Sequence, residues 1–154
     1  MRTKAILASV GSFLAVAALS LAADPIMGTW KLNEAKSKYS EGATKNSTVT
    51  YTMAGDMVKC TVDGMDKDGK AVHSEWTGKF DGKDYAVTGE PTSDMRAYKM
   101  VNANTFEMTM KKGGKMAGSG KIVVSADGKT RTVTTSMMDS MGMKMDNTAV
   151  YDKQ

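Results

Sequence analysis

The sequence predicts an all-β domain made of consecutive antiparallel hairpins. Turn signals recur about every ten to fourteen residues between Gly55 and Gly142. They are Gly55-Asp56, Asp68-Gly69, Asp81-Gly82, Gly89-Glu90-Pro91, Asn102-Ala103-Asn104, Gly113-Gly114, Asp127-Gly128 and Ser140-Met141-Gly142. Such residues tolerate the positive φ angles that tight hairpins need. Between the turns, apolar and polar residues alternate with a period of two, which predicts strands with one buried face.

The predicted strands each place a set of residues on the buried face. In chain order these sets are Val49, Tyr51 and Met53; Val58, Cys60 and Val62; Val72, Ser74, Trp76, Gly78 and Phe80; Phe106, Met108 and Met110; Gly118, Gly120, Ile122 and Val124; and Met141, Met143, Met145, Ala149 and Tyr151. The polar link between Asn33 and Asn46 has room for one or two helical turns and could cover one end of the domain. About ten strands in this order predict either an up-and-down barrel or a sandwich. Closure into a barrel would remove exposed strand edges.

Residues 1–22 have the composition of a cleaved secretory signal. Arg2 and Lys4 are followed by an apolar run that is short for a membrane span, and Ser20-Leu21-Ala22 supplies small residues before a cleavage site at Ala23. The predicted mature domain is therefore 23–154, exported to the periplasm or secreted, without stable membrane insertion after cleavage. An uncleaved N-terminal anchor is the alternative.

Charge and cysteine content limit the possible partners. Loss of Arg2 and Lys4 with the signal lowers the formal net charge from +4 to +2. The remaining lysines alternate with Asp and Glu, which is typical of a solvated surface and not of a nucleic-acid interface. Cys60 is the single cysteine, so no disulfide forms within the chain. The domain must depend on its apolar core, and no oligomeric state is predicted.

Both ends of the predicted domain resemble a known superfamily. Gly28-Thr29-Trp30-Lys31-Leu32 is similar to the first strand of the calycins, the lipocalins and fatty-acid-binding proteins. Ala149-Val150-Tyr151-Asp152-Lys153 is similar to the last strand of fatty-acid-binding proteins. The whole segment also resembles small exported bacterial proteins with a lipocalin-like domain. The resemblance implies a single antiparallel up-and-down barrel of about 8–10 strands.

The resemblance also implies structural roles for a few residues. Gly28 would allow a tight approach, and Trp30 would close one end of the barrel with an arginine packed over its ring. Arg131 is the expected arginine, and Arg96 is the other candidate. Two features depart from fatty-acid-binding proteins: Ala149 stands where their last strand carries a carboxylate-binding arginine, and the link after Asn33 is too short for their helical lid.

The predicted function is non-enzymatic binding of a small apolar or amphipathic molecule inside the barrel, without a cofactor. The residues expected to line the ligand site are Trp76, Phe80, Tyr85, Phe106, Met108, Met110 and Tyr151. Tyr98 or Tyr151 would orient the ligand through a hydroxyl. Catalysis has little support, because the chain has one histidine, His73, and no nucleophile motif. A structural barrel with a filled core and no ligand is an alternative.

Methionine is the most unusual part of the composition. The chain has 15 methionines, and a single leucine, Leu32, lies beyond the signal. Methionine thus replaces leucine as a flexible core residue. Met137, Met138, Met141, Met143 and Met145 gather at one hairpin, and the last three would share one strand face. Thioethers suit Cu(I), so a periplasmic copper site at this hairpin is an alternative function.

Overall fold

The computed structural model of the chain describes residues 24–139 and 141–154. The predicted signal at 1–22 lies outside the described residues. The elements are β1 (Gly28–Leu32), η1 (Glu34–Lys36), β2 (Lys45–Ala54), β3 (Met57–Met65), β4 (Ala71–Gly78), β5 (Tyr85–Thr88), β6 (Met95–Asn102), β7 (Thr105–Lys112), β8 (Lys115–Val124), β9 (Thr130–Met138) and β10 (Lys144–Lys153). The one helix among them, η1, is a single 3-10 turn and is far too short to cross a membrane.

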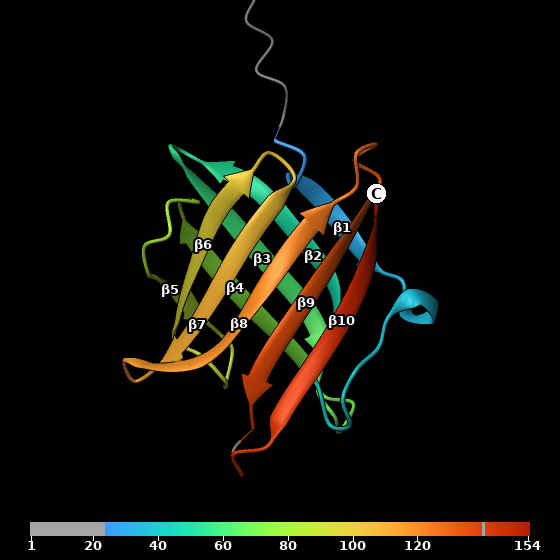
Figure 1. The fold of residues 1–154 in the computed structure, drawn as a ribbon, viewed down its shortest axis with the longest axis vertical. Coiled ribbons are helices and arrows are strands. Elements are labelled where there is room, and N and C mark those ends of the chain that lie inside the picture. The colour runs from blue at the N-terminus through green and yellow to red at the C-terminus, as the bar shows by residue number, and fades with distance from the viewer. Residues whose placement is uncertain (1–23, 140) are drawn as a thin grey trace, which may run out of the picture.

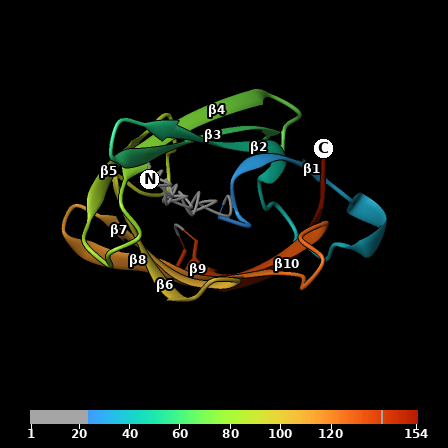
Figure 2. The same cartoon turned by 90° about the horizontal axis from the view of Figure 1, so that it is seen from above.

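The ten strands form one closed antiparallel barrel in simple sequence order. The barrel closes at β1, where Trp30 pairs with Val49 of β2 on one side and with Lys153 of β10 on the other. Figure 1 shows the strands inclined around the barrel, and Figure 2 shows them surrounding its interior. The predicted all-β barrel, of the kind found in lipocalins and fatty-acid-binding proteins, is confirmed, and the sandwich alternative is wrong.

The predicted turns fall between strands. Gly55, Gly69 and Gly128 adopt positive φ angles of 66°, 76° and 71° at the tips of their hairpins, where residues with a Cβ would be strained. The predicted inward parity holds along most strands, but Met53 is 63% exposed. Met53 lies one residue before the end of β2, close to the Gly55 turn, where the hairpin projects into solvent.

The link after β1 partly covers one end of the barrel, as expected. It begins with η1, whose Asn33 cap accepts a hydrogen bond from the Lys36 amide at 3.3 Å. The link then runs along β10, where Lys38 and Thr148 form an isolated bridge. Residues 41–44 come next and lie at the rim of the interior cavity. A short link thus shapes the cavity opening without a helical lid.

Candidate functional site

The barrel encloses a cavity of about 650 Å³ that opens at the end carrying residues 41–44 and the β9–β10 hairpin. This volume lies within the usual range for small-molecule sites, about 300–1,000 Å³. It far exceeds the space of a few waters, each of which takes up about 30 Å³ in the liquid. The interior of this barrel is therefore not filled by its own side chains.

Trp30 closes the opposite end. Its ring is fully buried, and its indole Nε1 donates a hydrogen bond to the Ile26 carbonyl oxygen at 2.8 Å. The Arg131 guanidinium carbon lies 5.4 Å from the centroid of the Trp30 ring, as the resemblance implies. Gly28 begins β1 with φ +103°, and a Cβ there would lie 3.3 Å from Cε of Lys153. The Lys153 Nζ is 5.1 Å from the Trp30 ring centroid, so two cations lie close to this ring.

Arg131 is the most deeply buried charge that lines the cavity. Its guanidinium carbon lies 5.3 Å from the Tyr51 ring centroid and 4.5 Å from that of Tyr151. Nη1 donates a hydrogen bond to the Tyr51 hydroxyl at 3.0 Å, while the buried Nε has no partner in the described part of the chain. Burial lowers the pKa of Arg131, but the Tyr51 and Tyr151 oxygens more than offset this, so its pKa lies above the ordinary value. The side chain stays charged.

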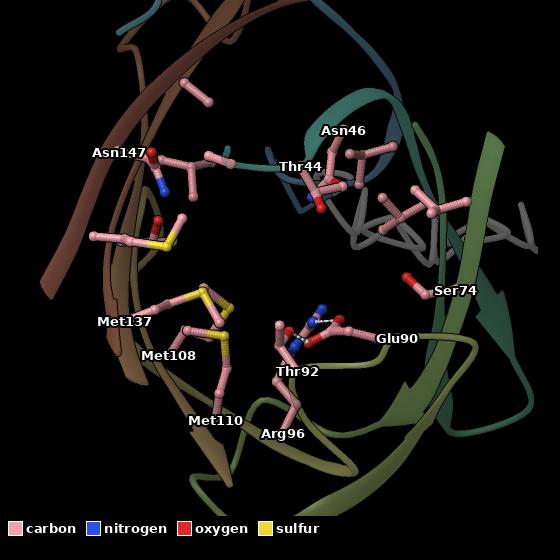
Figure 3. A pocket seen from close by; sticks show the side chains of 18 of the residues that line it. Thr44, Asn46, Ser74, Glu90, Thr92, Arg96, Met108, Met110, Met137 and Asn147 are labelled. Atoms are coloured by element: carbon pink, nitrogen blue, oxygen red, sulfur yellow. Dashed lines mark hydrogen bonds and ion pairs between the residues drawn. The ribbon is translucent and has the colours of Figure 1, made fainter. Parts of the chain in front are cut away.

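Arg96 is the second buried arginine of the cavity, and a carboxylate neutralises it. It forms an ion pair with Glu90 and donates to the Tyr98 hydroxyl at 3.3 Å. Ser93 donates a hydrogen bond to the other oxygen of Glu90. Figure 3 shows Glu90 and Arg96 meeting at one side of the cavity. No such carboxylate pairs with Arg131 among residues 24–139 and 141–154, so the two buried cations differ in their electrostatic environment.

Methionines form one wall of the cavity, which we call the thioether wall: Met108, Met110, Met137 and Met145. Figure 3 shows the first three gathered on one side. Met108, Met110 and Tyr151, which are expected to line the ligand site, lie along the wall of this cavity.

The other expected lining residues pack together instead. Trp76, Phe80, Tyr85 and Phe106 do not line the cavity. The Trp76 and Phe80 rings stack at 6.2 Å, Tyr85 meets Trp76 edge-on at 5.8 Å, and Phe80 meets Phe106 at 5.0 Å. Gly78 makes room for this cluster, because a Cβ there would lie 2.5 Å from Tyr85 and 2.6 Å from Trp76. The placement expected for these four residues is therefore corrected: Trp76 and Phe106 are buried in the core, and Phe80 and Tyr85 pack against it while partly buried. Tyr98, which meets Trp76 edge-on, lines the cavity.

The Met137–Met145 hairpin does not present its methionines on one face. Met137 points inward, whereas its neighbour Met138 is 60% exposed. Met141 and Met143 precede β10 and are 82% and 63% exposed. The expectation that Met141, Met143 and Met145 share one strand face is wrong, because the apolar alternation continues into a turn. Binding of copper by the hairpin stays a prediction.

Cys60 and His73 lie apart. Cys60 is buried inside the barrel, where burial raises the pKa of its thiol. His73 is exposed on β4 at the cavity rim, with Nδ1 2.6 Å from an Asp63 oxygen and Nε2 3.4 Å from a Glu75 oxygen. These two hydrogen bonds raise the pKa of His73 above its usual 6.5.

His73 should therefore make stability depend weakly on pH. Because its folded-state pKa is the higher one, protonated His73 stabilises the fold below about pH 6.5, and this contribution is lost as pH rises through the folded pKa. Asp63→Asn is expected to lower the His73 pKa in an NMR titration, whereas Asp68→Asn on the neighbouring turn should leave it unchanged. An unaltered pKa in Asp63→Asn would contradict this assignment.

Sequence patterns missed part of the site. Glu90 belongs to a predicted turn, so its buried ion pair with Arg96 was not foreseen. Tyr51 was placed inward, but its hydrogen bond to Arg131 depends on contact between β2 and β9 across the barrel. One signal was present: Arg96 and Tyr98 share the parity of an inward strand face, and a charged residue at that parity indicates a cavity or a buried pair.

Comparisons with known proteins support the fold. No protein-family model and no curated protein matches the chain. Among solved structures, EF1p2_mFAP2b bound to DFHBI is similar, with a TM-score of 0.53 and 9% identity, covering 86% of this chain and 97% of that one. The redesigned β barrel mFAP1 bound to DFHBI has a TM-score of 0.47 and 11% identity, over 84% of this chain and 95% of that one. The similarity to EF1p2_mFAP2b shows the barrel fold alone.

Proposed function

We propose that this protein binds a small amphipathic organic molecule in the barrel without chemically converting it. The observation that carries the proposal is the cavity of about 650 Å³ with a buried, uncompensated Arg131 among its lining residues. A buried cation without a carboxylate is costly unless another group compensates it. An anionic group on the ligand would supply that compensation and would accept a hydrogen bond from the guanidinium.

The remaining lining fits the apolar part of such a molecule. Met108, Met110, Ile122 and Val133 contribute apolar surface, and methionine adapts readily to the shape of its partner. Burial of ligand surface there contributes about 25 cal/mol per Å², less the cost of ordering the ligand. The neighbour EF1p2_mFAP2b was solved with DFHBI, which is in keeping with a small organic molecule as the class of ligand.

The carboxylates of the cavity support binding in preference to catalysis. Glu90 is engaged by Arg96 and Ser93, while Glu41 and Asp139 belong to the link and the hairpin at the rim. The exposed His73 is held between two carboxylates. Among the described lining residues, none combines a nucleophile with a base in hydrogen-bond contact, as covalent catalysis would need.

Filling the cavity tests the proposal. The probe 1-anilinonaphthalene-8-sulfonate, which joins aromatic rings to an anionic group, is expected to bind with saturation at one site per protein. Ala149→Phe and Thr135→Phe each add a ring inside the cavity and should weaken binding at least tenfold. Val123→Phe, on the exposed face of β8, is the matched control and should bind like the wild type. Equal binding by folded filled variants and control would contradict the proposal.

A further inference from the structure

Three methionines and one glycine form a row across four neighbouring strands of the cavity wall. Met110 of β7 pairs with Gly118 of β8, Gly118 pairs with Met137 of β9, and Met137 pairs with Met145 of β10. This row therefore carries three thioethers on four consecutive strands. Met108 lies two residues from Met110 on the same face of β7 and adds a fourth sulfur one row deeper.

The glycines of β8 allow these side chains to converge. A Cβ at Gly118 would lie 2.8 Å from Cγ of Met137 and 3.0 Å from Cε of Met110, and one at Gly120 would lie 2.8 Å from Cε of Met108. Strands β7 and β9 are separated by two strand spacings, about 10 Å. Methionine side chains extending from both strands can close that gap only where β8 has no side chain. Figure 3 shows the resulting group of Met108, Met110 and Met137 on one wall.

Thioether sulfur is a soft and uncharged ligand, and it selects Cu(I) over hard cations. Among the described residues, no group of three or more His, Cys, Asp or Glu side chains is placed to hold a metal ion. The two buried arginines repel a cation at the thioether wall only weakly. Arg96, which pairs with Met110 in the same row, is neutralised by Glu90. Arg131 lies six residues along β9 from Met137, about 20 Å at the rise of a strand.

We propose that Met108, Met110 and Met137 form a Cu(I) site inside the barrel, with Met145 beside Met137 as a fourth sulfur. The site goes beyond the proposed binding of an organic molecule, and it shares Met108 and Met110 with the apolar lining of the cavity. It also differs from a copper site on the hairpin. Met138, Met141 and Met143 of that hairpin are 60%, 82% and 63% exposed.

Two matched triple variants test the site. Cu(I) affinity is measured without oxygen, by competition with the chromophoric Cu(I) chelator bicinchoninate. The wild type is expected to bind one Cu(I) per protein. Replacing Met108, Met110 and Met137 together with leucine should weaken binding at least a hundredfold. The same replacement of Met138, Met141 and Met143 should change it less than threefold. Cys60→Ser should also bind like the wild type, because the thiol is not part of the site.

Several outcomes would overturn the proposal: absence of Cu(I) binding by the wild type, unchanged affinity in the inner triple variant, or loss of affinity in the outer triple variant or in Cys60→Ser. Single variants Met110→Leu and Met137→Leu give the same test if the inner triple variant does not fold, each with a loss of at least tenfold. Binding of the anilinonaphthalene probe and binding of Cu(I) are measured separately on the wild type, where the first tests the proposed function and the second tests this site. Failure of the copper site is thereby distinguished from failure of the proposed function.

Discussion

Replacing Trp30 with alanine is expected to lower the free energy of unfolding by about 3–5 kcal/mol, the range for large aromatic residues in a core. Trp30 is fully buried at the point where β1 joins β2 to β10. The change would remove the hydrogen bond to the Ile26 carbonyl oxygen and the ring surface under Arg131. The guanidinium would then lose one of its three aromatic neighbours while remaining buried.

Urea unfolding followed by far-UV circular dichroism measures this loss. Met53→Ala provides the control, because this side chain is 63% exposed and its loss should change stability by no more than about 0.5 kcal/mol. A cost below about 1 kcal/mol for Trp30→Ala would show that the barrel does not depend on this closure.

Replacing Arg131 with methionine is expected to weaken binding of an anionic ligand about 10- to 100-fold, the equivalent of about 1.5–3 kcal/mol for a hydrogen bond to a charged group. Methionine keeps the apolar stem of the side chain and removes the charge. Stability should change far less than in Trp30→Ala, because the lost cation–π contacts are offset by removal of a buried, unpaired cation.

A pair of probes isolates the role of the charge. The anionic probe 1-anilinonaphthalene-8-sulfonate should bind more weakly to Arg131→Met, whereas N-phenyl-1-naphthylamine, which has the same rings without the sulfonate, should bind as it does to the wild type. Lys121→Met, on the exposed face of β8, is the control for overall charge. If both probes lose affinity equally, Arg131 acts through the shape of the cavity and not through its charge.

The strands and turns were predictable because their signals are local. Period-two alternation marks a strand wherever one face is buried, and positive-φ glycines mark the hairpins between strands. Closure of the barrel is different, since it depends on contacts between Trp30 and Lys153, far apart in the chain. The resemblance of the Gly28–Leu32 segment to the first strand of calycins predicted this closure, which period-two alternation alone does not predict.

The candidate site was predictable only in part, because inward parity does not distinguish core from cavity. Trp76 and Met108 both point inward, yet the first packs among aromatic rings and the second lines open space. Whether an inward side chain packs in the core or lines the cavity depends on how side chains from several strands share the interior volume. The sequence placed Gly118 and Gly120 on the inward face of a predicted strand. Their packing role became apparent only with the positions of Met110 and Met137 on the flanking strands.

Native mass spectrometry of the protein isolated from its natural source tests the central claim, that the barrel holds a small organic molecule, most directly. The folded protein is expected to carry an additional mass corresponding to one such molecule, released when the protein is denatured. The released molecule should bear an acidic group together with an apolar part. A folded protein whose mass equals that of the polypeptide alone would contradict the account.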